Sequence, residues 1–186
     1  MQSLQIGVMG SSADLAYTEK LSAIATELGQ LIAASDNTLI FGAEKDYDSL
    51  SAVASRAALA AGGTTIGVTY GRKEAVFGQQ PSTLIASGLE RGGGREFTLV
   101  LSCDVIICIG GGSGTLNEML VAYQAGIPIV GLANTGGWSQ QLSGQYLDAR
   151  KRLKIMPAQN PQQAVELAIK LARAQESSDR ESRSAT

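Results

Sequence analysis

The chain has 186 residues, a hydrophobic fraction of 44%, a charged fraction of 17% and a formal net charge of -2. This length suits one domain with a sizeable core, and the slight acidity disfavours a nucleic-acid backbone as the main partner, because binding to backbone phosphates requires a basic face. The sequence contains no histidine, which excludes histidine-based zinc sites, catalytic triads and histidine acid–base chemistry.

The N-terminal segment MQSLQIGVMGSS has no basic stretch followed by an apolar one, as a signal peptide would. No apolar segment approaches the roughly 20 residues of a membrane span. We therefore expect a cytoplasmic protein with no membrane partner. The two cysteines, Cys103 and Cys108, are too few for a disulfide framework, and we expect both to be buried thiols.

In the first half of the chain, short apolar segments alternate with longer amphipathic ones. Strands are predicted at residues 4–9, 38–41, 64–69 and 82–86. The first helix is predicted from apolar residues in steps of three and four, at Leu21, Ile24, Leu28 and Leu31. An Ala-rich helix is predicted at 49–61, where Gly62 and Gly63 end it. Segment 70–80 lacks periodicity and is predicted to be a loop.

The second half continues the same alternation. Helices are predicted at 95–102, at 116–125 with Gly126 as the C-terminal stop, and from Asn160 and Pro161 onward. Strands are predicted at 105–109, 127–132 and 154–156. The segment VIICI at 105–109 is apolar throughout, which is typical of a central parallel strand buried on both faces. Segment 134–143, which holds Trp138, is predicted to be a polar glycine-rich loop, with Trp138 either packing or covering a cleft.

This order of elements predicts an α/β fold with a doubly wound parallel sheet, Rossmann-like, in a single ligand-binding domain at residues 1–174. Residues 175–186 are polar and are predicted to form a disordered tail. In such folds ligands bind at the carboxyl ends of the strands, where the strand order reverses. The chemistry is therefore expected in the loops that follow the strands.

The strongest candidate site is a glycine-rich loop between the predicted strand 105–109 and the helix that follows it. Its residues are Gly110, Gly111, Gly112, Ser113, Gly114 and Thr115. Glycines let backbone N–H groups approach an anion, and the helix N-terminus adds a partial positive charge. The loop therefore predicts a phosphate cradle, although it lacks the Gly-Lys-Ser/Thr of a Walker A loop. A tight turn between strand and helix is the structural alternative.

Three further groups could extend this site. Glu118 follows Thr115 at the spacing of a capping box, so it either caps the helix or places a carboxylate beside the phosphate. Gly10, Ser11 and Ser12 offer a second helix N-terminus with hydroxyl groups, or a simple helix cap, and the absence of G-x-G-x-x-G disfavours NAD. Arg95, next to Gly92–Gly94, could pair with a phosphate or be an ordinary surface residue.

Together these segments resemble a known superfamily. The stretch REFTLVLSCDVIICIGGGSGTLNE, from Arg95 to Glu118, is similar to the R…D…PGGxGTxxE region of the Lonely Guy and "lysine decarboxylase-like" Rossmann proteins. The opening IGVMGSS and the segment GIPIV also match, so the resemblance covers about residues 4–132. Within the superfamily the chain looks closest to the molybdenum cofactor carrier proteins, because Gly110 stands where the phosphoribohydrolases have proline.

The resemblance implies a protein that binds the molybdenum cofactor, or a related phosphorylated pterin, non-covalently in a basic-lined, glycine-rich cleft. It also implies a homodimer or homotetramer and no metal ligated by the protein. The implied cofactor-binding residues are the glycine-rich loop together with Gly10, Ser11, Ser12, Arg95 and Glu118.

Two other functions stay open at this point. One is a phosphoribohydrolase that cleaves the N-glycosidic bond of purine nucleoside 5'-monophosphates, for which the resemblance implies Arg95 and Glu118 as catalytic residues. The other is a nucleotide-binding sensor without catalysis. The resemblance to the carrier branch favours a binding protein over an enzyme.

Overall fold

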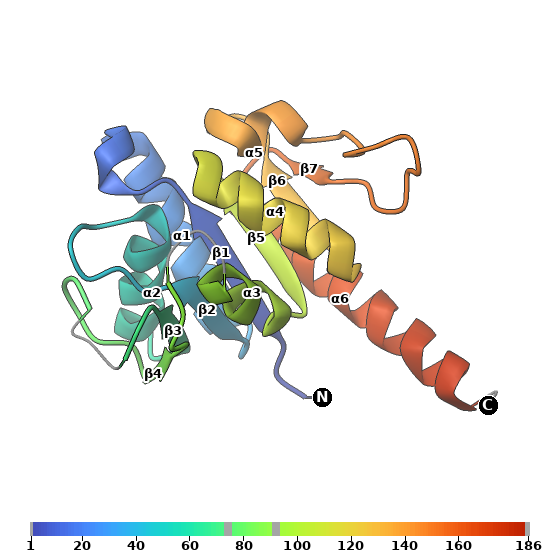
Figure 1. Ribbon diagram of the computed structural model, residues 1–186, viewed down its shortest axis with the longest axis horizontal. Coiled ribbons are helices and arrows are strands. Elements are labelled where there is room, and N and C mark those ends of the chain that lie inside the picture. Colours follow the sequence, from blue (N-terminus) through green and yellow to red (C-terminus); the bar gives the residue numbers. More distant parts are fainter. Residues whose placement is uncertain (1, 73–75, 91–93, 185–186) are drawn as a thin grey trace.

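The computed structural model describes residues 2–72, 76–90 and 94–184, and within them seven parallel strands form one sheet (Figure 1). The spatial order is β4-β3-β2-β1-β5-β6-β7. The strands are β1 (Gln5–Gly10), β2 (Thr38–Gly42), β3 (Thr64–Thr69), β4 (Thr83–Ala86), β5 (Val105–Ile109), β6 (Ile129–Leu132) and β7 (Met156–Ala158). This arrangement confirms the predicted doubly wound, Rossmann-like fold.

Helices cover both faces of this sheet. They are α1 (Glu19–Ala34), α2 (Leu50–Ala60), α3 (Gly94–Leu101), α4 (Ser113–Ala125), α5 (Gly137–Leu142) and α6 (Pro161–Ser184), with a short 3-10 turn at Ala13–Leu15. One buried cluster joins the sheet to α1, α2 and α6, and a second joins it to α3 and α4. Figure 1 shows α3 and α4 on one side of the sheet and α1 on the other. Two separate apolar layers therefore hold the domain together.

The strand order reverses between β1 and β5. Their parallel register pairs Gly10 with Ile109, the last residue of each strand. All five residues of β5 are buried, as its uninterrupted apolar sequence predicts. The loops that leave β1 and β5 therefore start side by side, at the point where ligands bind in this class of fold.

Local sequence signals account for several helix ends. Thr18 and Ser49 cap α1 and α2, with their side-chain oxygens accepting hydrogen bonds from the N–H groups of Leu21 and Ala52. The Asn160 side chain accepts from the Gln163 N–H at the start of α6. Gly126 ends α4 in the left-handed conformation, with φ of 74°.

The largest differences between the structure and the sequence-based expectations lie at α5 and α6. The prediction of a loop at 134–143 was wrong where α5 forms, and Trp138 packs against the α3–α4 side of the core. Helix α6 continues to Ser184, into the segment for which the composition predicts disorder. Two effects favour this extension. Arg173 and Glu176 form an ion pair where the polar segment begins, and each residue that extends a formed helix adds one backbone hydrogen bond.

None of the helices in the described part of the chain has the length and apolar character needed to cross a membrane.

Candidate functional site

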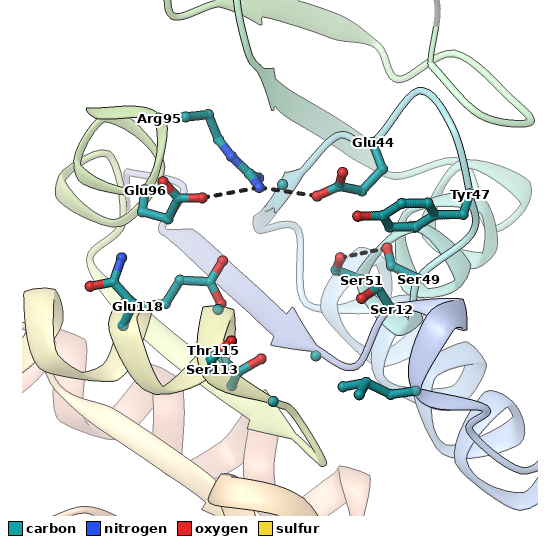
Figure 2. Close-up of a pocket in the computed structure, with 16 residues that line it drawn as sticks. Ser12, Glu44, Tyr47, Ser49, Ser51, Arg95, Glu96, Ser113, Thr115 and Glu118 are labelled. Atoms are coloured by element: carbon teal, nitrogen blue, oxygen red, sulfur yellow. Dashed lines mark hydrogen bonds and ion pairs between the residues drawn. The ribbon is translucent and has the colours of Figure 1, made fainter. Parts of the chain in front are cut away.

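A cavity of about 450 Å³ lies at the carboxyl edge of the sheet, between the loops after β1, β2 and β5 (Figure 2). That volume lies within the range of small-molecule sites. Its described lining consists of Gly10, Ser12, Leu15, Gly42, Glu44, Tyr47, Ser49, Ser51, Arg95, Glu96, Gly112, Ser113, Gly114, Thr115, Asn117 and Glu118.

The first turn of α4 forms one end of this cavity. Gly112 is the N-terminal cap, and the Leu116 N–H donates the first helical hydrogen bond to the Gly112 carbonyl at 3.0 Å. The amides of Ser113, Gly114 and Thr115 therefore have no acceptor within the helix. These amides, the positive end of the helix dipole and nearby hydroxyl groups can bind an anion such as a phosphate.

The two glycines before this turn serve the fold rather than the cavity wall. The Gly110 N–H donates to Thr135 Oγ1 at 2.9 Å, and the Gly111 N–H donates to Ser11 Oγ at 2.7 Å. Both have positive φ, 61° and 95°, which glycine adopts without strain. Their amides are thus already paired within the protein, and Gly110, Gly111 and Ser11 do not line the cavity.

A buried group of charges forms the other end. The Arg95 guanidinium, from the start of α3, pairs with Glu44 at 3.0 Å and with Glu96 at 3.3 Å, and lies over the Tyr70 ring at 4.7 Å. A Cβ atom on Gly42 would lie 2.1 Å from an Arg95 nitrogen, so a larger residue there would displace this guanidinium from its present position. Arg95 is therefore anchored between two carboxylates and is not an ordinary surface residue.

Glu118 lies between the two ends, on α4 and one turn beyond Thr115. Its side chain points into the cavity (Figure 2), the residue is 92% buried, being 8% exposed, and no hydrogen bond joins its carboxyl group to another described residue. Burial raises the pKa of Glu118 to about 8; Arg95 opposes this shift, and Glu96 and Glu44 add to it. The group is therefore a mostly protonated carboxylic acid at neutral pH.

This raised pKa predicts a pH-dependent stability. Between the ordinary glutamate pKa and about pH 8, Glu118 is protonated in the folded protein and ionised in the unfolded chain. Unfolding therefore releases a proton, and the free energy of unfolding falls as the pH rises through this window. The contribution reaches at most about 1.4 kcal/mol per pH unit. We expect Glu118→Gln to remove this slope in urea unfolding measured from pH 5 to 9.

The matched control is Glu27→Gln, because Glu27 is exposed on α1. We expect it to keep the slope of the wild-type protein. Equal slopes in wild type and Glu118→Gln would show that Glu118 is not held protonated.

The structure brings together eight of the residues that the sequence assigned to the site. They are Gly10, Ser12, Arg95, Gly112, Ser113, Gly114, Thr115 and Glu118. The capping-box alternative for Glu118 was wrong: α4 begins at Ser113, so Thr115 lies inside the first turn and the cap is Gly112. Gly92 and Gly93 lie outside the described residues, as does part of the 70–80 loop.

The expectation of a basic-lined cleft was also wrong for the described lining. Its charged residues are one arginine and three glutamates, and the arginine pairs with two of them. Sequence reasoning missed Glu44 and Glu96 as site residues. Glu44 follows β2, where the rule that loops after strands carry the site could have found it, whereas Glu96 carries no local signal beyond its place beside Arg95.

This arrangement can hold an anionic group at one end and a group rich in hydrogen-bond donors at the other. Among the described residues, no set of three or more cysteine, aspartate or glutamate side chains is arranged to hold a metal ion. The neutral carboxyl group of Glu118 can also donate a proton.

Comparison with known proteins agrees with the fold. A model of the SLOG cluster4 family matches residues 3–165, which confirms the resemblance seen in the sequence. A protein of Archaeoglobus fulgidus named "Uncharacterized protein" is 30% identical over 132 residues, which cover 71% of this chain and 82% of that protein.

Two solved structures are similar over nearly the whole chain. The molybdenum cofactor binding protein from Rippkaea orientalis is 29% identical, with a TM-score of 0.76 and coverage of 92% of this chain and 98% of its own. The molybdenum cofactor carrier protein from Chlamydomonas reinhardtii is 28% identical, with a TM-score of 0.75 and coverage of 91% and 98%.

Proposed function

This chain belongs to the SLOG cluster4 family, and from that membership and the geometry of its cavity we propose that it is a binding protein for the molybdenum cofactor or a closely related phosphorylated pterin. The similarity to two proteins named for binding or carrying this cofactor supports the proposal, since each aligns over more than nine tenths of both chains.

The proposal rests on one observation: a single cavity has a helix start that can bind an anion at one end and carboxyl groups that can accept hydrogen bonds at the other. The ligand's phosphate would lie at the amides of Ser113, Gly114 and Thr115, with Ser12 on the opposite side. Its pterin ring would extend toward Glu118. A carrier needs ground-state affinity rather than chemistry, and a phosphate held by several N–H groups contributes much of it.

Native mass spectrometry of the protein purified without oxygen tests this function. We expect a bound mass of a phosphorylated pterin when the expression host makes the cofactor, and none when a host blocked in its synthesis is used. A bound nucleotide would favour the sensor function instead. Protein that stays empty after incubation with freshly released cofactor would contradict the proposal.

One observation favours a second function, the hydrolysis of purine nucleoside 5'-monophosphates. Glu118 is a buried carboxyl group with a pKa of about 8 beside a guanidinium, as a general acid in glycosidic cleavage would be. Two results together would establish this activity. The wild type would release ribose 5-phosphate from AMP, and Glu118→Gln would bind the nucleotide without releasing ribose 5-phosphate. No release from AMP or GMP would exclude it for these substrates.

We also propose that the protein forms a homo-oligomer through the outer face of α3 and α4. These helices pack against each other, and Phe97, Leu101 and Leu120 on them are 52%, 58% and 42% exposed. Phe97 and Leu101 lie four residues apart on α3 and so share one face of that helix, and exposed large apolar side chains favour burial against a second copy. Light scattering would give the molar mass, and a monomer at micromolar concentration would contradict this assembly.

A further inference from the structure

We propose that the acidic end of the cavity, formed by Glu44, Glu96 and Glu118, is a subsite that selects the ligand's heterocycle by an edge carrying at least two N–H donors. The 2-amino-4-oxopyrimidine ring of a pterin, or of guanine, has such an edge. The inference rests on the proposed function in placing the ligand's phosphate at the first turn of α4.

The charge at this end favours donors over a second anion. The only described cation in the lining is Arg95, and it already contacts Glu44 at 3.0 Å and Glu96 at 3.3 Å. Glu118 adds a third carboxyl group that is not bonded to Arg95. A second phosphate or carboxylate would therefore meet repulsion, whereas N–H groups would meet oxygen acceptors.

Unused hydrogen-bonding capacity points independently to a ligand. Glu118 is 92% buried, and its side chain points into the cavity and has no hydrogen-bond partner among the described residues (Figure 2). Buried polar groups in proteins are nearly always paired, so groups left unpaired at a cavity wall are suited to complete their hydrogen bonds with a bound molecule.

The geometry of a carboxylate explains the choice of ring. When Glu118 is ionised, its two oxygens can accept two parallel N–H bonds, which matches the ring N–H and the amino group on one edge of a 2-amino-4-oxopyrimidine. Adenine offers an amino group beside a ring nitrogen that accepts, and ribose offers neither. Residue 118 lies about 4.5 Å along α4 from Thr115, since each helical residue rises about 1.5 Å, so a phosphate and a ring on one molecule can reach both ends.

Four probes that share a phosphate test this subsite by calorimetry: 6-hydroxymethylpterin phosphate, GMP, AMP and ribose 5-phosphate. Because burial raises the pKa of Glu118 to about 8, the titrations are made at about pH 8.5, where the carboxylate predominates. We expect the pterin phosphate and GMP to bind at least ~10-fold more tightly than AMP and ribose 5-phosphate, the scale of one lost hydrogen bond to a charged group.

The variant Glu118→Gln leaves the Arg95 ion pairs in place and should remove most of this preference while the affinity for ribose 5-phosphate stays unchanged. Glu44→Gln is the second variant, and exposed Glu27→Gln is the control that should match the wild type.

Equal affinity of the wild type for all four probes would overturn the subsite while leaving the phosphate site standing. So would a Glu118→Gln variant that loses as much affinity for ribose 5-phosphate as for the pterin phosphate. A preserved ranking without retention of the molybdenum cofactor would overturn the proposed function alone, and no binding of any probe would overturn both.

Discussion

Ser113→Asp is expected to weaken the binding of any phosphorylated ligand by ~100-fold or more. The substitution places a carboxylate in the first turn of α4, where the free amides face the cavity. Two like charges 4 Å apart repel by about 4 kcal/mol at an effective dielectric constant of about 20. Because Ser113 is exposed, solvent screening reduces this repulsion to roughly 3 kcal/mol, which corresponds to about two orders of magnitude in affinity.

The fold itself should tolerate this change, because an acidic residue at a helix N-terminus is favourable by about 0.3–1 kcal/mol. Calorimetric titration with ribose 5-phosphate and thermal denaturation of the same sample separate the two effects. Ser113→Ala, which removes only a hydroxyl group, should lose about 10-fold or less. Gln30→Glu adds the same charge on the exposed side of α1 and should leave binding unchanged. Unaltered affinity in Ser113→Asp would mean that the phosphate binds elsewhere.

Gly29→Ala is expected to destabilise the fold by about 2–3 kcal/mol. A Cβ atom on Gly29 of α1 would lie 2.0 Å from the Ala54 carbonyl oxygen and 3.0 Å from the Ala58 nitrogen, both in the backbone of α2. Backbone atoms cannot rotate away as a side chain can, so the two helices must separate. The lost packing exceeds the gain of roughly 0.5–1 kcal/mol that alanine brings over glycine inside a helix.

Gly114→Ala is the matched control for this prediction. Gly114 also lies in a helix, but a Cβ atom there would meet nothing within 4 Å, so we expect a gain of roughly 0.5–1 kcal/mol. Urea unfolding measures both variants, and the denaturant slope should stay the same. If Gly29→Ala were as stable as the wild type, α1 and α2 could not lie as close together as described.

The order and type of most elements could be predicted from the sequence. Six of the seven predicted strands match β1–β6, because their apolar segments are short, rich in β-branched residues and bounded by turn residues. The seventh, predicted at 154–156, shares only Met156 with β7. Helix α5 was missed for a physical reason. Its six residues include two backbone amides, of Trp138 and Ser139, that donate to Gly111 and Gly110, so contacts distant in sequence hold it in place rather than an apolar period.

The candidate site was predicted unevenly. The strand–glycine–helix segment after β5 indicated an anion-binding helix start, because that geometry follows from local backbone preferences. The same reasoning could not show that the Gly111 N–H is used by Ser11, 100 residues away in sequence, and is therefore not offered to a ligand.

By itself, the sequence determined the fold class, the place of the candidate site at the strand ends and the presence of an arginine and a glutamate near a glycine-rich loop. Only the tertiary structure decided the charge state and the partners of these two side chains. Arg95 is held by Glu44, 51 residues earlier in the chain, and Glu118 becomes a protonated acid because the surrounding chain removes it from water. Both outcomes depend on desolvation and on charges brought together by folding, which no local pattern of residues encodes.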